Sequence, residues 1–120
     1  MNVATILSPE AVVAAQVDAY NAHDLYRFVA CYSPHVVISG WPSGAARLEG
    51  RDALADYYRD YRFNLPDLSV QIRQRIVYGN VVIDHEEVYG LEKQPVMAVA
   101  IYEVHDGLIS SVHFLDEPTW

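Results

Sequence analysis

The chain has 120 residues, 52% of them hydrophobic and 20% charged, which is enough apolar content for the core of one domain. Its 8 Lys and Arg against 16 Asp and Glu give a formal net charge of −8. Such an acidic domain lacks the positive surface with which proteins bind nucleic acid or anionic lipid, so we expect neither as a partner. The single cysteine, Cys31, excludes an intrachain disulfide and the cysteine-rich zinc motifs.

The apolar runs do not indicate a membrane protein. None approaches the ~20 residues of a membrane-spanning helix. The N-terminus carries no positive charge before its first apolar residues, which is not typical of a signal peptide. We therefore expect a cytoplasmic protein without membrane association.

Three helices are predicted in the first half of the chain. Ser8-Pro9-Glu10 combines a capping serine, a first-turn proline and an acidic residue, which favours a helix start. After a turn at 21–24, with Asp24 as the expected cap, an apolar stripe predicts a second helix from Leu25 that ends at Ser33-Pro34. Helical spacing then predicts a third helix, whose apolar residues are Leu54, Tyr57, Tyr58 and Tyr61.

Five strands are predicted between and after these helices. Residues 35–41 are rich in β-branched and aromatic side chains and predict the first strand, followed by a loop over 42–50. From Leu68 onward apolar and polar residues alternate, and Gly79-Asn80 predicts a hairpin turn to a strand over 81–89. Strands over 96–104 and 108–115 follow, joined by a tight turn at 105–107. Helices first and consecutive antiparallel strands later predict an α+β fold.

Four local sequences carry a resemblance to known proteins. They are YNAHD (20–24), CYSPHVV (31–37), LEGRDAL (48–54) and IYEVHDGLI (101–109). With the order of elements, they resemble the nuclear transport factor 2-like superfamily, in the branch of SnoaL-like polyketide cyclases, ketosteroid isomerases and limonene epoxide hydrolases. The resemblance covers residues 8–116 and implies one domain over 1–120. In that domain three helices would pack on a curved, mixed, largely antiparallel sheet, forming a cone with an internal pocket.

The resemblance to ketosteroid isomerases implies three pocket positions. Gln16 stands at the position of their oxyanion-hole tyrosine, Gly40 at that of the base, and Tyr102 at that of the late aspartic acid. Glycine cannot act as a base, whereas Gln16 and Tyr102 can donate hydrogen bonds. Two supporting tyrosines of that family fall on Tyr32 and Tyr58.

The other two activities also lack a residue. Phe114 stands where the SnoaL-like cyclases and the epoxide hydrolases carry an acid on the last strand. The strand after Gly79-Asn80 lacks the arginine that epoxide hydrolases need. The resemblance therefore implies the fold and assigns none of the three activities, because one fold hosts many chemistries.

His85 and Glu87 are the residues that we expect to carry chemistry. They are two apart on a predicted strand and so share one face, where a histidine beside a carboxylate can act as general base with its partner. The alternative is that this face lies outside, in water or in a dimer interface. Alternation leaves the choice open, because apolar residues occur on both faces: Val81 and Ile83 with His85, and Val82 and Val88 with Asp84 and Glu86.

Further pocket residues follow from helix faces and strand alternation. Tyr20 and Tyr58 lie on helix faces turned to the sheet, Trp41 ends the first strand, and Asp116 shares the inward alternation of Phe114. Buried phenols would give an apolar pocket a few oriented donors, which suits a ligand with a carbonyl or hydroxyl. No pair of histidines has metal-ligand spacing, so we expect neither a metal nor another cofactor.

These observations predict a cofactor-independent acid–base enzyme of isomerase, lyase or hydrolase type, acting on a small, mostly apolar molecule. The alternative is a non-catalytic ligand-binding or dimerisation module on the same fold. We also expect a homodimer through the outer face of the sheet, where apolar side chains would otherwise face water. Those side chains are Val37, Val99, Ile101 and Leu115.

Overall fold

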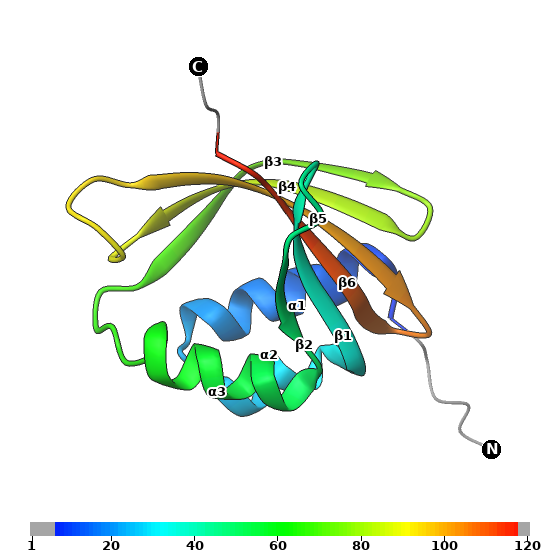
Figure 1. Ribbon diagram of the computed structural model, residues 1–120, viewed down its shortest axis with the longest axis horizontal. Helices are drawn as coiled ribbons and strands as arrows, with labels where there is room; N and C mark the ends of the chain where they lie inside the picture. Colours follow the sequence, from blue (N-terminus) through cyan, green and yellow to red (C-terminus); the bar gives the residue numbers. More distant parts are fainter. Residues whose placement is uncertain (1–6, 118–120) are drawn as a thin grey trace.

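The computed structural model describes residues 7–117 and has three helices and six strands in them. The helices are α1 (Pro9–Asn21), α2 (Leu25–Ala30) and α3 (Arg51–Tyr61). The strands are β1 (Tyr32–Trp41), β2 (Ala46–Glu49), β3 (Ser69–Tyr78), β4 (Val81–Tyr89), β5 (Val96–His105) and β6 (Leu108–Leu115). The α+β order predicted from the sequence is confirmed, and the curved sheet lies over one layer of helices (Figure 1).

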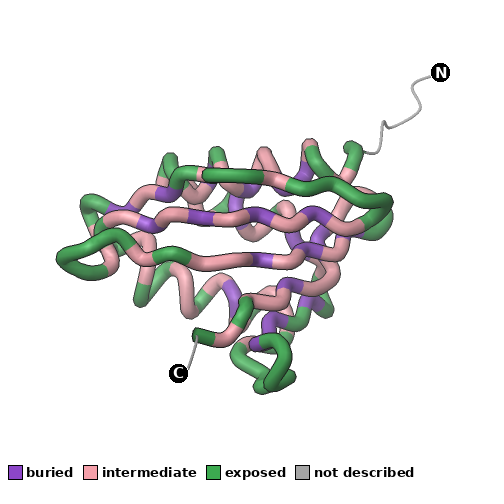
Figure 2. The backbone as a smooth tube through the Cα atoms, turned by 90° about the horizontal axis from the view of Figure 1, so that it is seen from above, coloured by how far each residue is buried: buried purple, intermediate pink, exposed green. Residues whose placement is uncertain are grey.

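The six strands form one mixed sheet in the order β2-β1-β6-β5-β4-β3. Strands β3 to β6 are an antiparallel meander, and β1 returns beside β6 in parallel. This arrangement places β6 and β5 at the centre of the sheet and leaves β2 and β3 as its edge strands. Most of β3 is exposed, whereas the neighbouring strands alternate between buried and partly buried residues (Figure 2).

Side-chain caps fix the first two helix starts as predicted. The Ser8 hydroxyl accepts a hydrogen bond from the Ala11 amide at 3.2 Å, and the Asp24 carboxylate accepts one from the Arg27 amide at 3.1 Å. The predicted end of the second helix at Ser33-Pro34 is wrong. Helix α2 ends at Ala30 and β1 already begins at Tyr32, because the backbone there pairs with Ile109 of β6.

The loop predicted over residues 42–50 contains the short strand β2. Its backbone pairs antiparallel with β1, with Leu48 opposite Ile38 and Glu49 opposite Val37. Four residues with three exposed side chains carry no alternation that a sequence pattern could reveal. Only the neighbouring strand determines that this segment is extended.

A bulge in β3 changes which of its side chains face the helices. The pairing with β4 shifts between Ile72 and Gln74, so one extra residue is inserted at that point. The simple alternation expected from Leu68 onward therefore fails in the second half of the strand. Arg75 faces the interior opposite Asp84, and Ile76 is 60% exposed on the outer face.

Aromatic rings form much of the contact between the helices. Phe28 of α2 packs against Tyr58 of α3 with ring centroids 4.6 Å apart and against Tyr32 at 5.1 Å. Tyr20 of α1 meets Phe63 edge-on at 5.6 Å. These rings join the helices to one another and to the start of β1. None of the helices in residues 7–117 is long and apolar enough to cross a membrane.

Candidate functional site

A cavity of about 530 Å3 lies between the helices and the inner face of the sheet. This volume falls within the range typical of small-molecule sites. Aromatic and aliphatic side chains make most of its wall, and four ionisable acid or guanidinium side chains border it. Those four are Arg47, Arg62, Glu86 and Glu117.

Alternation along β4 decides which charged residues reach the cavity. Val82, Asp84, Glu86 and Val88 are buried on the inner face, whereas the residues between them are only partly buried. His85 and Glu87 therefore lie on the outer face and do not line the cavity. The expectation that these two face the pocket is wrong. Val81 and Ile83 share their face and are apolar, but this sheet has apolar side chains on its outer face as well, so an apolar face need not be the inner one.

His85 and Glu87 do not pair with each other on the outer face. Glu87 accepts a hydrogen bond from Arg73 at 3.1 Å and another from the Tyr89 hydroxyl. His85 stands opposite Gln74 and Val99 and makes no ion pair with a carboxylate of residues 7–117. The predicted acid–base pair is thus absent from this part of the chain.

Glu86 is the buried acid of the cavity. It is 7% exposed and has no hydrogen-bond partner among the described residues. Burial, and secondly the nearby Asp84, raise the pKa of Glu86 to about 8, against a smaller opposing effect of Arg75. Near neutral pH this side chain therefore exchanges readily between a carboxylic acid and a carboxylate.

Asp84, two residues earlier on the same face, is neutralised by an arginine. Its carboxylate receives a bidentate pair of hydrogen bonds from Arg75, at 2.6 Å and 2.8 Å, and is fully buried. This partner is available because the β3 bulge turns Arg75 inward. Of two neighbouring inward carboxylates, one is thus fixed as an ion pair and Glu86 remains free.

A hydrogen-bonded chain ends in an oriented donor near Glu86. The Tyr32 hydroxyl donates to Gln16 Oε1 at 3.1 Å, and Gln16 Nε2 donates to the Tyr102 hydroxyl oxygen at 3.2 Å. Since the Tyr102 oxygen is occupied as acceptor, its own proton is left for a ligand. Burial, and next the charge of Glu86, raise the pKa of Tyr102 well above its usual value, so the phenol stays protonated.

Two further phenols border the cavity from the helices. Burial raises the pKa of Tyr20 and of Tyr58, and Glu86 contributes to both increases. Neither hydroxyl has a hydrogen-bond partner within residues 7–117. They are donors for a ligand or for water in the cavity.

The structure brings five of the predicted pocket residues together. Gln16, Tyr20, Tyr58, Tyr102 and Phe114 all line the cavity. They come from α1, α3, β5 and β6, so the cavity joins segments far apart in the sequence.

Gly40, Trp41 and Asp116 do not line the cavity. The Asp116 carboxylate accepts hydrogen bonds from the Ser43 amide at 2.8 Å and from the Ser43 hydroxyl at 2.9 Å, which ties the end of β6 to the β1–β2 loop. It also packs directly over Gly40, where a Cβ would clash with the Asp116 Oδ1. Trp41 follows on the opposite side of β1 and is 54% exposed.

Sequence reasoning missed Glu86 and the two cavity arginines. The signal for Glu86 was present, because Val82 and Val88 share its face. For Arg47 no signal existed, since it lies on the unpredicted strand β2. Arg62 directly follows Tyr61, the last residue of α3. Residues 7–117 contain no group of three or more His, Cys, Asp or Glu side chains that could hold a metal ion.

Solved structures with this fold are numerous but distant in sequence. An uncharacterised cystatin-fold protein from Novosphingobium aromaticivorans superposes with a TM-score of 0.83 at 20% identity, over 92% of this chain and 99% of that one. A candidate ketosteroid isomerase from Kribbella flavida gives 0.78 at 18% identity, over 93% and 79%. A computationally designed 17-OHP binder gives 0.78 at 20%, over 92% and 95%. Identities this low establish the fold alone.

The family is established by the sequence itself. A search of the curated proteins finds no match. Residues 13–112, however, match the SnoaL-like domain, and this span contains Glu86 and the whole Tyr32–Gln16–Tyr102 chain. With the cone-shaped α+β fold of its structural neighbours, the chain belongs to the SnoaL-like domain family.

Proposed function

We propose that this protein is a cofactor-independent acid–base enzyme in which Glu86 transfers protons to and from a small carbonyl compound bound in the cavity. The observation that carries the proposal is the state of Glu86: buried, unpaired and lining the same cavity as the oriented Tyr102 donor. A carboxyl group with a pKa near neutral pH serves both as acid and as base. The proposal transfers to Glu86 the role that the sequence analysis gives to His85 and Glu87.

The arrangement supports isomerisation through an enolate. The Glu86 carboxylate removes a proton from the carbon next to the ligand carbonyl, and the carbonyl oxygen takes up the resulting negative charge. The Tyr102 hydroxyl donates to that oxygen, and Gln16 holds Tyr102 in place by donating to its oxygen at 3.2 Å. Protonated Glu86 then returns the proton at another carbon, so the reaction is balanced without a cofactor.

The test is proton transfer on a panel of β,γ-unsaturated ketones, beginning with 3-cyclohexenone, followed by the absorbance of the conjugated product. We expect Glu86→Gln to lower kcat/KM by roughly 10²–10⁴-fold, the usual contribution of a positioned general base. The wild-type rate should rise with pH up to about 8, as Glu86 ionises.

Glu87→Gln is the matched control, since it makes the same change one residue away on the outer face. It should change kcat/KM by less than twofold. Equal losses in the two variants, or a Glu86 side chain that titrates at the usual value for glutamate, would contradict the proposal.

A non-catalytic ligand-binding domain is the second candidate function. It is supported by the designed binder with the same fold and by the phenols of Tyr20 and Tyr58, which can hold a ligand carbonyl without reacting. Binding of the panel ketones without turnover, lost in Tyr102→Phe, would favour this function over catalysis.

We also propose a homodimer through the outer face of the sheet. Ile76, Ile83 and Ile101 form a row across β3, β4 and β5, each paired with the next in the backbone register. Val37 extends the apolar outer surface and is 39% exposed, whereas Leu115 borders the cavity and is not part of this surface. A second copy would remove this surface from water.

A further inference from the structure

The two arginines of the cavity lack the carboxylate partner that most other arginines of the described chain have. Four arginines form ion pairs with carboxylates: Arg27, Arg59, Arg73 and Arg75. Arg51 donates to a backbone carbonyl. Arg47 and Arg62 make no ion pair with a carboxylate of residues 7–117, although the chain has twice as many acidic as basic residues.

Both guanidinium groups lie against aromatic rings that line the cavity. That of Arg47 lies 5.7 Å from the Phe114 ring centroid, and that of Arg62 lies 5.0 Å from the ring centroid of Tyr57. Stacking on a ring holds a guanidinium in place while its N–H groups remain available. One N–H group of Arg62 donates to the Tyr61 carbonyl at 2.7 Å, and its other N–H groups remain available.

With Glu86 protonated, the net charge of the cavity wall is opposite in sign to that of the protein. The chain carries a net charge of −8, yet two arginines and the exposed Glu117 are the lining residues that carry full charge when Glu86 is protonated. Arg62 acts electrostatically on Tyr20 and Tyr58, but it is not among the charges that affect Glu86. Arg62 therefore lies on the side of the cavity that carries the Tyr20 and Tyr58 phenols.

We propose that the ligand of this site is an apolar carboxylate, with its anionic group at Arg62 and Arg47 and its carbonyl or hydroxyl group at Glu86 and Tyr102. This inference rests on the proposed function for the Glu86 end and adds the substrate class. A guanidinium fork matches a carboxylate in two parallel hydrogen bonds. Neutral apolar molecules of the same shape leave both arginines unsatisfied, which makes the charge of the ligand the discriminating property.

The experiment uses two fluorescent probes that differ in one charge, 6-hydroxy-2-naphthoate and its methyl ester. Each has a hydroxyl at one end of a planar apolar body and the tested group at the other. In titrations at pH 7 and low salt, we expect the acid to bind the wild-type protein about tenfold more tightly than the ester. The ratio should fall as salt is added, because these arginines border solvent.

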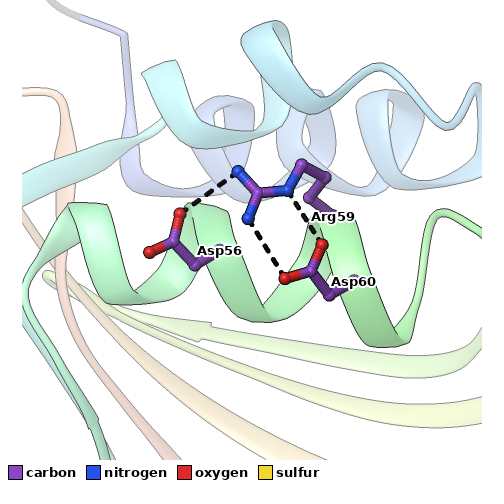
Figure 3. Close-up of polar contacts among 3 residues, drawn as sticks. All are labelled: Asp56, Arg59 and Asp60. Atoms are coloured by element: carbon purple, nitrogen blue, oxygen red, sulfur yellow. Dashed lines mark hydrogen bonds and ion pairs between the residues drawn. The ribbon is translucent and has the colours of Figure 1, made fainter.

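Two variants then test whether the cavity arginines cause the preference for the acid over the ester. Arg47→Gln combined with Arg62→Gln should weaken binding of the acid to the level of the ester and leave the ester unchanged. Arg59→Gln is the matched control: Arg59 lies on the same helix as the rings of Tyr57 and Tyr58, but its side chain is 56% exposed and paired with Asp56 and Asp60 (Figure 3). It should keep the tenfold ratio.

Equal affinity of the two probes, a preference that survives the double substitution, or failure of both probes to bind overturns the carboxylate inference. If a variant does not fold, the acid-to-ester affinity ratio of the wild-type protein and its fall with added salt still test the inference. Failure of the proposed function has a different signature. In that case, Glu86→Gln binds both probes with the same affinity as the wild-type protein, whatever the ratio of the acid's affinity to the ester's.

Discussion

The two faces of β4 carry similar side chains with different physical properties. Asp84 and Glu86 point inward, His85 and Glu87 point outward, and all four are polar or charged. On the outer face, Glu87 pairs with the 55% exposed Arg73 and keeps contact with water. On the inner face the same type of carboxylate loses water, so its protonation depends on the one arginine within reach. A carboxylate acquires unusual acid–base chemistry here through burial, not through its residue type.

The largest difference between the faces is expected for the two arginines of β3. Arg75→Ala removes the partner of the fully buried Asp84 and should lower the free energy of unfolding by about 3–5 kcal/mol. Arg73→Ala removes a solvent-exposed partner of Glu87 and should cost less than about 1 kcal/mol. Urea denaturation of both variants measures the difference. Similar costs would mean that the inner pair is hydrated.

The outer face is tested by charging its isoleucine row. Ile101→Lys places an ammonium group beside Ile83 and, in the proposed dimer, does so twice. We expect the dimer dissociation constant to rise at least ~100-fold, equivalent to about 3 kcal/mol. Sedimentation at micromolar concentration measures it, with Tyr26→Lys on the exposed surface of α2 as control. A wild-type monomer under these conditions would rule out the interface.

Glu86 should oppose folding at alkaline pH. Its pKa is about 8 in the folded state and near its usual value of ~4.3 when unfolded, so folding binds a proton between these values. Stability from this group is complete below the unfolded pKa and is lost as pH rises through the folded one. Glu86→Gln should therefore stabilise the protein by roughly 2–3 kcal/mol at pH 9 and by little at pH 4.

Thermal unfolding across this pH range measures the effect, with Glu87→Gln as the outer-face control. The control makes the same change in a side chain that is paired with the exposed Arg73. A Glu86→Gln stabilisation that is equal at pH 4 and pH 9 would show that the effect comes from packing.

The smallest effect is expected for the charge of Asp84 on its neighbour. Asp84→Asn removes the second cause of the raised Glu86 pKa and leaves the positive Arg75 behind. The pKa of Glu86 should fall from about 8 toward the usual glutamate value, and any base-catalysed rate should reach its plateau at lower pH. An NMR titration with labelled glutamate side chains detects the change. A Glu86 pKa that is unaffected would leave burial as its sole cause.

The sequence by itself determined the three helices and five of the six strands in their order. These elements are marked by local signals: the capping residues Ser8 and Asp24, the turn at Gly79-Asn80 and the period of the apolar residues. Each signal acts between residues close in the chain, so it can be recognised without the tertiary structure. The resemblance to a known family added the prediction of a mixed sheet, which the parallel pairing of β1 with β6 confirms. The family resemblance also placed Gln16, Tyr58 and Tyr102 in one pocket, where the structure has them.

Only the tertiary structure decided which face of β4 is the inside and which acid is left free. Valine and isoleucine occur on both faces, so alternation alone could not choose between Glu86 and Glu87. The β3 bulge, invisible in the sequence pattern, turns Arg75 toward Asp84 and so leaves Glu86 unpaired. Protonation of a carboxylate depends on water and charges within a few ångströms, and those neighbours come from strands and helices that meet only in the folded chain.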